Sequence, residues 1–477
     1  MHPRTSGMLF VTRDFFLWFL PVSLLAFHAA LAVGMRSLLV PMLLVASAVF
    51  YCWGDLEHAP VLVGSVLFNY AIGRALSGAH LSDGHRKAVL VAAIVVDLAL
   101  LGVFKYAGFI LSNLPLVGVT PPAVEIALPV GISFYTFTQI AFLVDLYGKG
   151  LQQRDIAGYG LFASYFPDIV AGPIIHWREV MPQFAQLRRG ETFSFGSAGY
   201  ASMLVEGAFM FSIGLLKKLL IADQLAVFAD LGYGDVASLH FVDAWLVSLA
   251  YTFQIYFDFS GYADMAIGVS LLFGVRLPLN FNSPYKAVSI QDFWRRWHMT
   301  LSRWLRDYLY IPMGGSRVPT AKIYRNLFVT FLLGGLWHGA AWTFVAWGAL
   351  HGLACCCQRA WSSAGHRMPN WAGIVVTFLF VNLSWVYFRA PDFAAANRLL
   401  ATMAHPHPGF TIRILQVWPL LIVGALLVWC CPNSQSLAAG TLGRRVGVAG
   451  GLAGAAILVA MVATNISRPS PFIYYSF

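Results

Sequence analysis

The sequence predicts an all-α, polytopic membrane protein, and three observations lead to this prediction. Of its 477 residues, 58% are hydrophobic. Only 11% are charged, whereas a soluble domain carries about 25% charged residues. Charge-free stretches approaching the roughly 20 apolar residues that a spanning helix needs recur along the chain. These features exclude a water-soluble enzyme and a disulfide-stabilised secreted domain.

The first predicted span, residues 15–35, follows Arg13 and Asp14. It is longer than a typical signal-peptide core and continues into another apolar stretch, which favours a retained helix. Further spans are predicted at 37–54, 58–73, 88–104, 126–144, 198–216, 244–257, 265–275, 327–346, 348–358, 368–388, 414–431 and 446–467. Some are too short to cross alone and are expected to be re-entrant or shielded by neighbours. We expect a single integral-membrane domain, 1–477, with about ten to twelve spans.

The charges indicate topology. Lys and Arg number 31 and Asp and Glu 21, a net charge of +10. Cytoplasmic loops of membrane proteins collect Lys and Arg, so we attribute this excess to membrane topology. It is therefore no sign of a nucleic-acid partner, and none is expected. The six cysteines show no metal-site spacing, so no metal is expected. For the run Cys355–Cys357, apolar packing is favoured over palmitoylation.

Residues 291–325 form a basic and aromatic region with seven Lys or Arg. Five large side chains recur at helical spacing, namely Trp294, Trp297, Leu301, Trp304 and Tyr308. The pattern predicts an amphipathic helix at the cytoplasmic interface. Composition alone favours a lipid-facing anchor. The alternative is a basic platform for a phosphorylated donor from the cytosol.

Residues 326–358 contain no Asp, Glu, Lys or Arg but include His338 and His351. Ionisable groups at membrane depth are costly and tend to mark active sites or transport pathways. Glycines beside His338, among them Gly335 and Gly339, leave space for a substrate or for a tightly packed helix. The commoner alternative is a buried histidine bonded to a carbonyl group. On one straight helix the two histidines diverge, so they converge only if the chain breaks, with Gly348 as the candidate position.

His298, in the basic region, is the second candidate, because a neutral imidazole is a competent general base at cytoplasmic pH. Asp258 and Asp264 lie in another apolar stretch, where a structural hydrogen-bond network is favoured over catalysis. The partners expected for them are Tyr256, Ser260 and Tyr262. Asp97 and Lys105, eight residues apart on one apolar segment, are expected to pair.

Several common catalytic motifs are absent from the sequence. It contains no G-x-S-x-G, no P-loop and no H-E-x-x-H, and no His is followed five positions later by Asp. An α/β-hydrolase nucleophile, a nucleotide-binding loop and a zincin site are therefore not encoded.

Long segments of the chain resemble the membrane-bound O-acyltransferase family, and most of all its bacterial alginate O-acetyltransferase branch. They include the strings FWRRWH and GGLWHGAAW, which contain His298 and His338. The segments are residues 166–184, 254–268, 277–317, 332–352 and 471–477.

This resemblance implies a fold in which interfacial and re-entrant helices surround a central tunnel. It implies that His338 is the general base on an incoming hydroxyl and that His298 positions the donor or stabilises developing charge. The acyl group would come from a cytoplasmic thioester, with acetyl-CoA as donor substrate and no bound cofactor. Residues expected to bind the donor or line the tunnel are Arg295, Arg296, Trp297, Trp337, Asp258, Asn280 and His351.

The resemblance further implies a multi-pass protein of the bacterial inner membrane that serves the O-acetylation of an extracytoplasmic polysaccharide, with an alginate-like exopolysaccharide favoured. Its expected partners are the lipid bilayer, an extracytoplasmic acetyltransferase and the polysaccharide secretion machinery. One alternative is transfer of D-alanyl or another acyl group from an acyl carrier protein to a cell-wall polymer. Alternatives of other classes are a proton-coupled transporter or flippase that uses His338, Asp258 and Asp264, and a scaffold subunit without chemistry.

Overall fold

The computed structural model describes residues 8–78, 81–120, 126–149, 155–191, 196–439 and 472–473. Every regular element in these ranges is a helix, which confirms the predicted all-α class. The predicted span 446–467 lies outside the described residues, as does most of the segment 471–477.

Five predicted spans coincide with helices that are long and apolar enough to cross a membrane. These are Phe15–Ala32, Arg36–Asp55, Ala59–Ser77, Asp83–Asn113 and Asn370–Arg389. They contain η1 (Phe15–Phe19), α1 (Leu20–Ala32), α2 (Leu39–Asp55), α3 (Ala59–Ser77), α4 (Asp83–Leu101), η3 (Gly102–Tyr106), α5 (Ala107–Asn113) and α16 (Asn370–Arg389). The total of ten to twelve spans stays a prediction.

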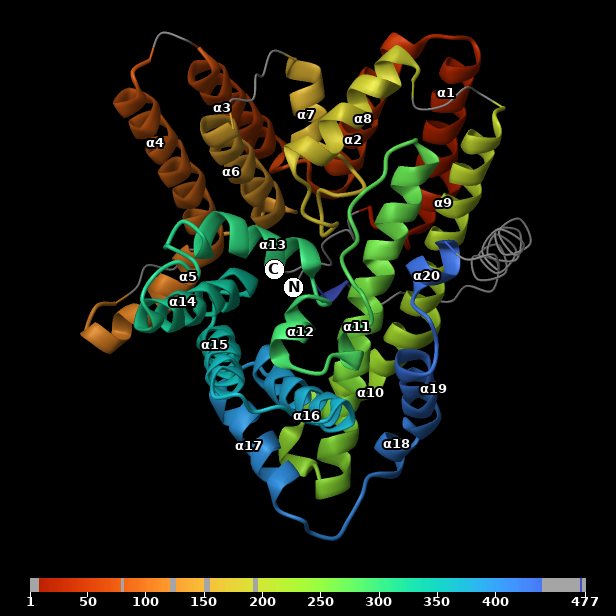
Figure 1. The fold of residues 1–477 in the computed structure, drawn as a ribbon. Helices are drawn as coiled ribbons and strands as arrows, with labels where there is room; N and C mark the ends of the chain where they lie inside the picture. Colours follow the sequence, from red (N-terminus) through yellow and green to blue (C-terminus); the bar gives the residue numbers. More distant parts are fainter. Residues whose placement is uncertain are drawn as a thin grey trace.

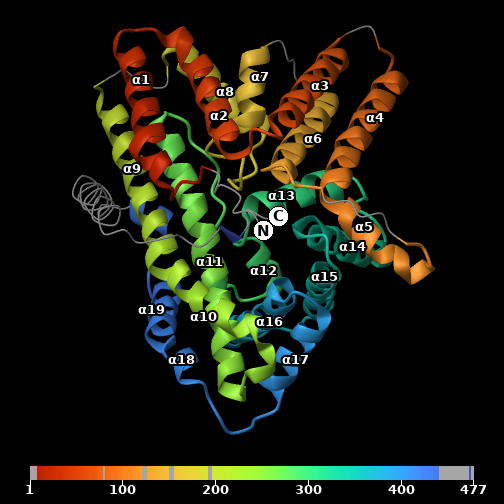
Figure 2. The same ribbon diagram turned by 180° about the vertical axis from the view of Figure 1, so that it is seen from behind.

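Two groups of helices are arranged around a pair of short central ones (Figure 1). One group combines α1–α4 with α6 (Ile132–Lys149), α7 (Ile156–Ser164) and α8 (Trp177–Arg189). The other contains α10 (Asp223–Gly234), α11 (Phe241–Leu272), α16, α17 (Phe393–Ala404), α18 (Ile412–Leu415) and α19 (Trp418–Trp429). Figure 2 shows α12 (Ile290–Trp294) and α13 (Met299–Leu305) between the two groups from behind as well. α9 (Ala198–Leu216) runs beside α11, and α20 (Ser434–Ala439) packs on α9.

The longest described helix, α11, is buried over most of its 32 residues. The sequence predicts two separate spans here, 244–257 and 265–275, and this prediction is wrong. Two pairs of glycines let α9 approach α11 closely: a Cβ on Gly214 would lie 2.5 Å from the carbonyl oxygen of Gly261, and one on Gly207 would lie 2.8 Å from that of Gly268. Such small-residue contacts are the usual means of packing helices in membranes.

The basic and aromatic region is not one amphipathic helix. α12 begins after Ser289, whose hydroxyl accepts a hydrogen bond from the backbone of Asp292. It ends at Trp294, and α13 begins only after His298. Trp294, Trp297 and Trp304 are each at most 7% exposed and pack inside the protein. The lipid-facing anchor that composition favours is therefore wrong.

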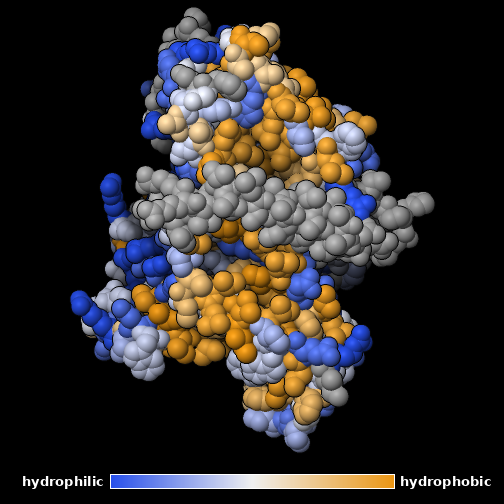
Figure 3. All heavy atoms as spheres, turned by 90° about the vertical axis from the view of Figure 1, so that its right-hand side faces the viewer, coloured by the Kyte–Doolittle hydropathy of each residue, from blue (hydrophilic) through white to orange (hydrophobic). Residues whose placement is uncertain are grey.

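The predicted span 327–346 is also broken. α14 (Thr320–His338) and α15 (Trp342–Ser363) form a helical hairpin with extended backbone at Gly339 and Ala341. Many large hydrophobic side chains are instead exposed on the outer surface, among them Trp18, Leu25, Val45 and Trp371. Figure 3 shows broad hydrophobic areas on one face, with hydrophilic side chains at its top, at its bottom and along one edge. Such a surface fits contact with a lipid bilayer.

Candidate active site

The structure brings His298 and His338 together, although they lie on separate elements and 40 positions apart in sequence. Their ring centroids are 6.4 Å apart. Both side chains are buried, with exposed fractions of 0% and 1%. The two histidines that the sequence singles out thus form one site.

His298 has an unusual backbone conformation. Its φ of 43° is in the left-handed region, which Ser283 alone shares among the described residues other than glycine. Histidine adopts this region more readily than bulky or branched residues do, but at a cost in free energy. The turn separates α12 from α13 and aims the imidazole inward, where its ring meets Phe259 at 4.8 Å.

Asn280 fixes the tautomer of His298. Its side-chain oxygen accepts hydrogen bonds from the backbone N–H of Thr300 at 3.3 Å and from the Thr300 hydroxyl at 2.9 Å. Because a backbone N–H can only donate, this atom is the amide oxygen. His298 Nδ1, which lies 3.1 Å from the same oxygen, must therefore carry the proton. The lone pair of a neutral His298 is then on Nε2.

His338 is the last residue of α14, and aromatic rings hold it in place. The nearest ring centroids are those of Trp337 at 5.0 Å, Trp347 at 5.1 Å and Phe388 at 5.3 Å. Trp337 stacks on Phe137 of α6 at 5.2 Å. The imidazole is thus oriented by side chains from α6, α15 and α16.

The glycines near His338 serve tight packing. A Cβ on Gly335 would lie 2.8 Å from the Cα of Gly348, so the backbones of α14 and α15 touch at this point. A Cβ on Gly339 would collide with the Phe344 ring. Of the two interpretations left open by the sequence, the structure supports the tightly packed helix.

His351 does not join the histidine pair. The chain breaks at Gly339–Ala341, and α15 passes through Gly348 without interruption. His351 Nδ1 accepts a hydrogen bond from the Trp294 indole at 3.2 Å, so Nε2 donates to the Ser384 hydroxyl at 3.0 Å. With both ring nitrogens bonded, His351 ties α12 to α15 and α16.

The intramembrane carboxylates have lysine partners that the sequence patterns did not reveal. Asp258 Oδ1 lies 2.7 Å from Lys218 Nζ, and Asp264 Oδ2 lies 2.7 Å from Lys217 Nζ. Both lysines are in η5 (Lys217–Ala222), the π-helical turn after α9. The prediction that tyrosine and serine hydroxyls are the main partners of these carboxylates is therefore wrong. The sequence did contain a signal for these partners, because Lys217 and Lys218 directly follow the apolar segment 198–216.

Asp97 and Lys105 do not pair, contrary to the prediction. Asp97 accepts a hydrogen bond from Asn69 at 2.8 Å, whereas Lys105 Nζ donates to the carbonyl oxygen of Trp337 at 2.5 Å. The two side chains extend to different neighbours because eight positions along a helix do not bring them to adjacent turns.

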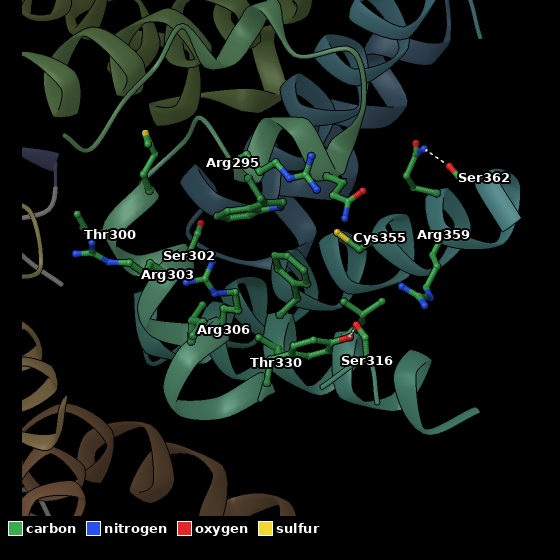
Figure 4. Close-up of a pocket in the computed structure, with 18 of the residues that line it drawn as sticks. Arg295, Thr300, Ser302, Arg303, Arg306, Ser316, Thr330, Cys355, Arg359 and Ser362 are labelled. Carbon is green, nitrogen blue, oxygen red and sulfur yellow. Dashed lines mark hydrogen bonds between the residues drawn. The ribbon is translucent and has the colours of Figure 1, made fainter. Parts of the chain in front are cut away.

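A basic cavity of about 940 Å³ opens beside the histidine pair. Four arginines line it, and Figure 4 shows them around the cavity, directly after α12, on α13, on the adjoining turn η8 (Arg306–Tyr310) and on α15. They are Arg295, Arg303, Arg306 and Arg359. Neither histidine lines the cavity, but Thr300 does. The Thr300 hydroxyl donates to the same side-chain oxygen of Asn280 that His298 Nδ1 contacts.

The four arginines differ in their partners. Arg303 forms a bidentate ion pair with Glu179, and Arg306 pairs with Asp307. Arg295 and Arg359 form no ion pair with any residue in the part of the chain that the structure describes. Their charges are therefore available to an anionic ligand.

Of the other residues expected at the donor site or tunnel, several lie elsewhere. Arg296 pairs with Asp292 at 3.0 Å and does not line the cavity. Trp297 is enclosed by Phe281, Phe293 and other aromatic rings. Asp258 forms its ion pair with Lys218 and does not line the cavity. Asn280 and Trp337 do contact the histidine pair.

The wall of the cavity formed by α13 and η8 is anchored to α6 and α8. Tyr308 donates its hydroxyl proton to Asp145 at 3.0 Å, and His176 Nδ1 lies 3.2 Å from the same hydroxyl oxygen. Burial lowers the pKa of His176, and the nearby Arg303 acts in the same direction. A neutral imidazole suits this network, which holds the arginine-bearing turn rigidly.

The site lies within a region that matches known proteins. A family model described as MBOAT, membrane-bound O-acyltransferase family, matches residues 124–393, which include both histidines and the cavity. Peptidoglycan O-acetyltransferase of Helicobacter pylori is 42% identical over 431 residues, covering 84% of this chain and 80% of the relative. Probable alginate O-acetylase of Pseudomonas aeruginosa is 42% identical over 403 residues, covering 83% and 75%. Teichoic acid D-alanyltransferase of Bacillus subtilis is 29% identical over 282 residues, covering 55% and 69%.

Proposed function

The chain belongs to the membrane-bound O-acyltransferase family, and from this membership and the paired histidines we propose that it transfers an acetyl group from a cytoplasmic thioester toward the O-acetylation of a polysaccharide outside the cytoplasm. It is an acyltransferase and a multi-pass membrane protein. The observation that carries the proposal is the convergence of His298 and His338, at 6.4 Å, beside a basic cavity.

The chemistry follows from the two imidazoles. One histidine takes the proton of the acceptor hydroxyl as its oxygen attacks the thioester carbonyl carbon. The tetrahedral intermediate then collapses, the carbon–sulfur bond breaks, and the thiolate leaves and is protonated. Such general-base assistance contributes roughly 10²–10⁴-fold to a rate. His338, which the aromatic rings hold, is the proposed base.

The tautomer of His298 refines its proposed role. With its proton on Nδ1, directed to Asn280, a neutral His298 offers only a lone pair at Nε2. It can accept a hydrogen bond from the acceptor hydroxyl, but it stabilises a negative oxygen only after it has gained a proton. Positioning the hydroxyl or relaying its proton therefore fits His298 better than stabilising an oxyanion from the start.

The cavity supports a phosphate-bearing donor. Its volume is in the range of about 300–1,000 Å³ typical of ligand sites. Arg295 and Arg359, which lack ion-pair partners in the described chain, suit the phosphate groups of acetyl-CoA. The basic-platform interpretation of residues 291–325 is thereby favoured over the anchor.

The acceptor is proposed as a class of polymer. Relatives with the same 42% identity are named for peptidoglycan and for alginate, so both polymers remain candidates beside the favoured alginate-like exopolysaccharide. We place the protein in the bacterial inner membrane, where it would pass acetyl groups to an extracytoplasmic acetyltransferase of the secretion machinery. Donation by an acyl carrier protein, as a second candidate, draws on the more distant D-alanyltransferase relatives. The relatives named above are named as acetylating or alanylating enzymes, which favours acyl transfer over a transporter.

The test is thioester cleavage by purified protein in nanodiscs, with radiolabelled acetyl-CoA as the substrate. We expect CoA release in wild type and its loss in His338→Ala, with His351→Gln as a control for a buried histidine outside the pair. Binding of acetyl-CoA without turnover would point to a missing acceptor or partner. Undiminished release in His338→Ala would refute the assignment of the base.

A further inference from the structure

The end of α14 creates a hydrogen-bonding problem next to the catalytic site. A helix leaves its last four carbonyl groups without partners inside the helix. α14 ends at His338 because Gly339 has an extended backbone, with φ −166° and ψ 149°. The carbonyl groups of Leu336 and Trp337, directly before His338, therefore need donors from elsewhere.

Two adjacent side chains of η3 supply these donors. Tyr106 donates its hydroxyl proton to the carbonyl oxygen of Leu336 at 2.9 Å. Lys105 Nζ donates to the carbonyl oxygen of Trp337 at 2.5 Å and to the Ser133 hydroxyl at 2.9 Å. A single turn of the α4–η3–α5 span thus closes the end of the helix that carries His338.

The charge of Lys105 matches this position. The lysine forms no ion pair in the described chain, and the carboxylate of Asp97 in the same span is bonded to Asn69. Its ammonium instead lies 5.4 Å from the centroid of the Trp337 ring, within reach of a cation–π interaction. It also lies at the C-terminus of α14, where the helix dipole places partial negative charge. The ammonium of the half-buried Lys105 therefore faces the carbonyl end of α14.

We propose that Lys105 and Tyr106 are positioning residues for His338: they fix the last turn of α14 and so hold the imidazole against His298. Both lie outside residues 124–393, the region that the family model matches. The N-terminal spans therefore complete the catalytic site. The kinetic part of this inference rests on the proposed function.

The kinetic consequence can be estimated. Displacing a catalytic group by about 1 Å can lower a rate about 10²-fold without touching the substrate. Lys105→Met removes the charge and both hydrogen bonds, and we expect kcat to fall about 10²-fold. Tyr106→Phe removes one hydrogen bond and keeps the ring, and we expect a fall of about threefold to tenfold. KM for acetyl-CoA should change less than twofold, because neither residue lines the basic cavity.

Matched controls exist in the same molecule. Lys87 is exposed at the other end of the same span, so Lys87→Met makes the same change away from α14. Tyr387 donates to the Asn397 side chain on the surface, so Tyr387→Phe is the control for Tyr106→Phe. Both controls should keep the wild-type kcat. Equal loss in control and test variants would overturn the inference.

A double-mutant cycle separates positioning from direct catalysis. If Lys105 acts through His338, adding Lys105→Met to His338→Ala should lower the residual rate no further. Full additivity of the two effects would overturn the inference. An unaltered kcat in Lys105→Met beside an inactive His338→Ala would overturn it as well, while leaving the proposed function intact.

Hydrogen exchange supplies a readout that does not need turnover. We expect Lys105→Met, and not Lys87→Met, to raise the exchange of peptides covering residues 330–345, with the rest of the described chain unchanged. Unaltered exchange there would refute the positioning role. If wild type released no CoA while exchange rose as expected, the proposed function would fail and the structural role would stand.

Discussion

The contact between α14 and α15 gives a sharp quantitative prediction, through the substitution Gly348→Ala. A Cβ at this position would lie 2.5 Å from the carbonyl oxygen of Phe331 and 3.0 Å from the Cα of Gly335. Both neighbours are backbone atoms, so no side chain can turn aside. Ordinary contact begins near 3.4 Å, and the two helices must therefore separate by roughly 1 Å.

This separation acts directly on the histidine pair. α14 ends at His338, and Trp347, next to Gly348, packs on the His338 ring at 5.1 Å. Overpacking of this kind costs about 1–3 kcal/mol of stability. A shift of about 1 Å at a catalytic group can cost about 10²-fold in rate, which equals about 2.7 kcal/mol of transition-state stabilisation. We expect kcat for CoA release to fall about 10²-fold in folded protein.

The assay is steady-state CoA release in nanodiscs, normalised to protein that elutes as a single species. Gly352→Ala provides a graded variant, because its Cβ would meet atoms of Phe328 at 3.1–3.2 Å, and we expect less than a tenfold loss. Gly64→Ala on α3, with nothing within 4 Å, is the matched control. Well-folded Gly348→Ala protein with the wild-type kcat would refute the reasoning.

Three further predictions follow from the site. Asn280→Ala leaves the Nδ1 proton of His298 and two donors of Thr300 without an acceptor. We therefore expect kcat in the CoA-release assay to fall about 10²-fold. Asn280→Asp retains the acceptor oxygen, and its kcat should fall less than tenfold. Arg359→Gln should raise KM for acetyl-CoA about tenfold with little change in kcat, as initial rates over a range of donor concentrations would show. Lys218→Met leaves Asp258 buried beside Asp223 without its cation and should lower stability by about 3–5 kcal/mol, measured as a large drop in thermal midpoint.

Each of these predictions has a contrary outcome. Equal rates in the two Asn280 variants would show that the tautomer of His298 does not matter. Arg296→Gln is the control for Arg359, since Arg296 is paired with Asp292 outside the cavity, and equal KM values would exclude a donor site there. A Lys218→Met protein as stable as wild type would mean that Asp258 is neutral when buried.

The local pattern of the sequence was sufficient for the all-α membrane class. Apolar stretches identified five membrane-length helices, four of them near their observed limits, whereas the helix Asp83–Asn113 extends beyond the predicted 88–104 at both ends. Two imidazoles inside long, unusual strings indicated His298 and His338. The prediction of the helices succeeds because burial in a bilayer imposes composition on each segment separately. The catalytic roles of the two histidines stay predictions.

Breaks in helices were harder to predict. Trp294, Trp297, Leu301 and Trp304 keep helical spacing through His298, yet the chain turns there with a positive φ. The turn is stabilised by Asn280, which lies 18 residues earlier. The break at Gly339 likewise brings in contacts from α15 and η3. Asp258, in contrast, lies inside the continuous helix α11, where Lys218 forms an ion pair with it.

What the sequence alone determined is therefore the membrane character of the chain, most of its apolar helices and the residues able to do proton chemistry. Only the tertiary structure decided what those residues touch: Asn280 on His298, the lysines on the intramembrane carboxylates, and Lys105 and Tyr106 on the end of α14. The last two contacts join residues 232 and 230 positions apart. Local periodicity reports which face of a helix is apolar, but a hydrogen bond across such a separation depends on how whole helices pack.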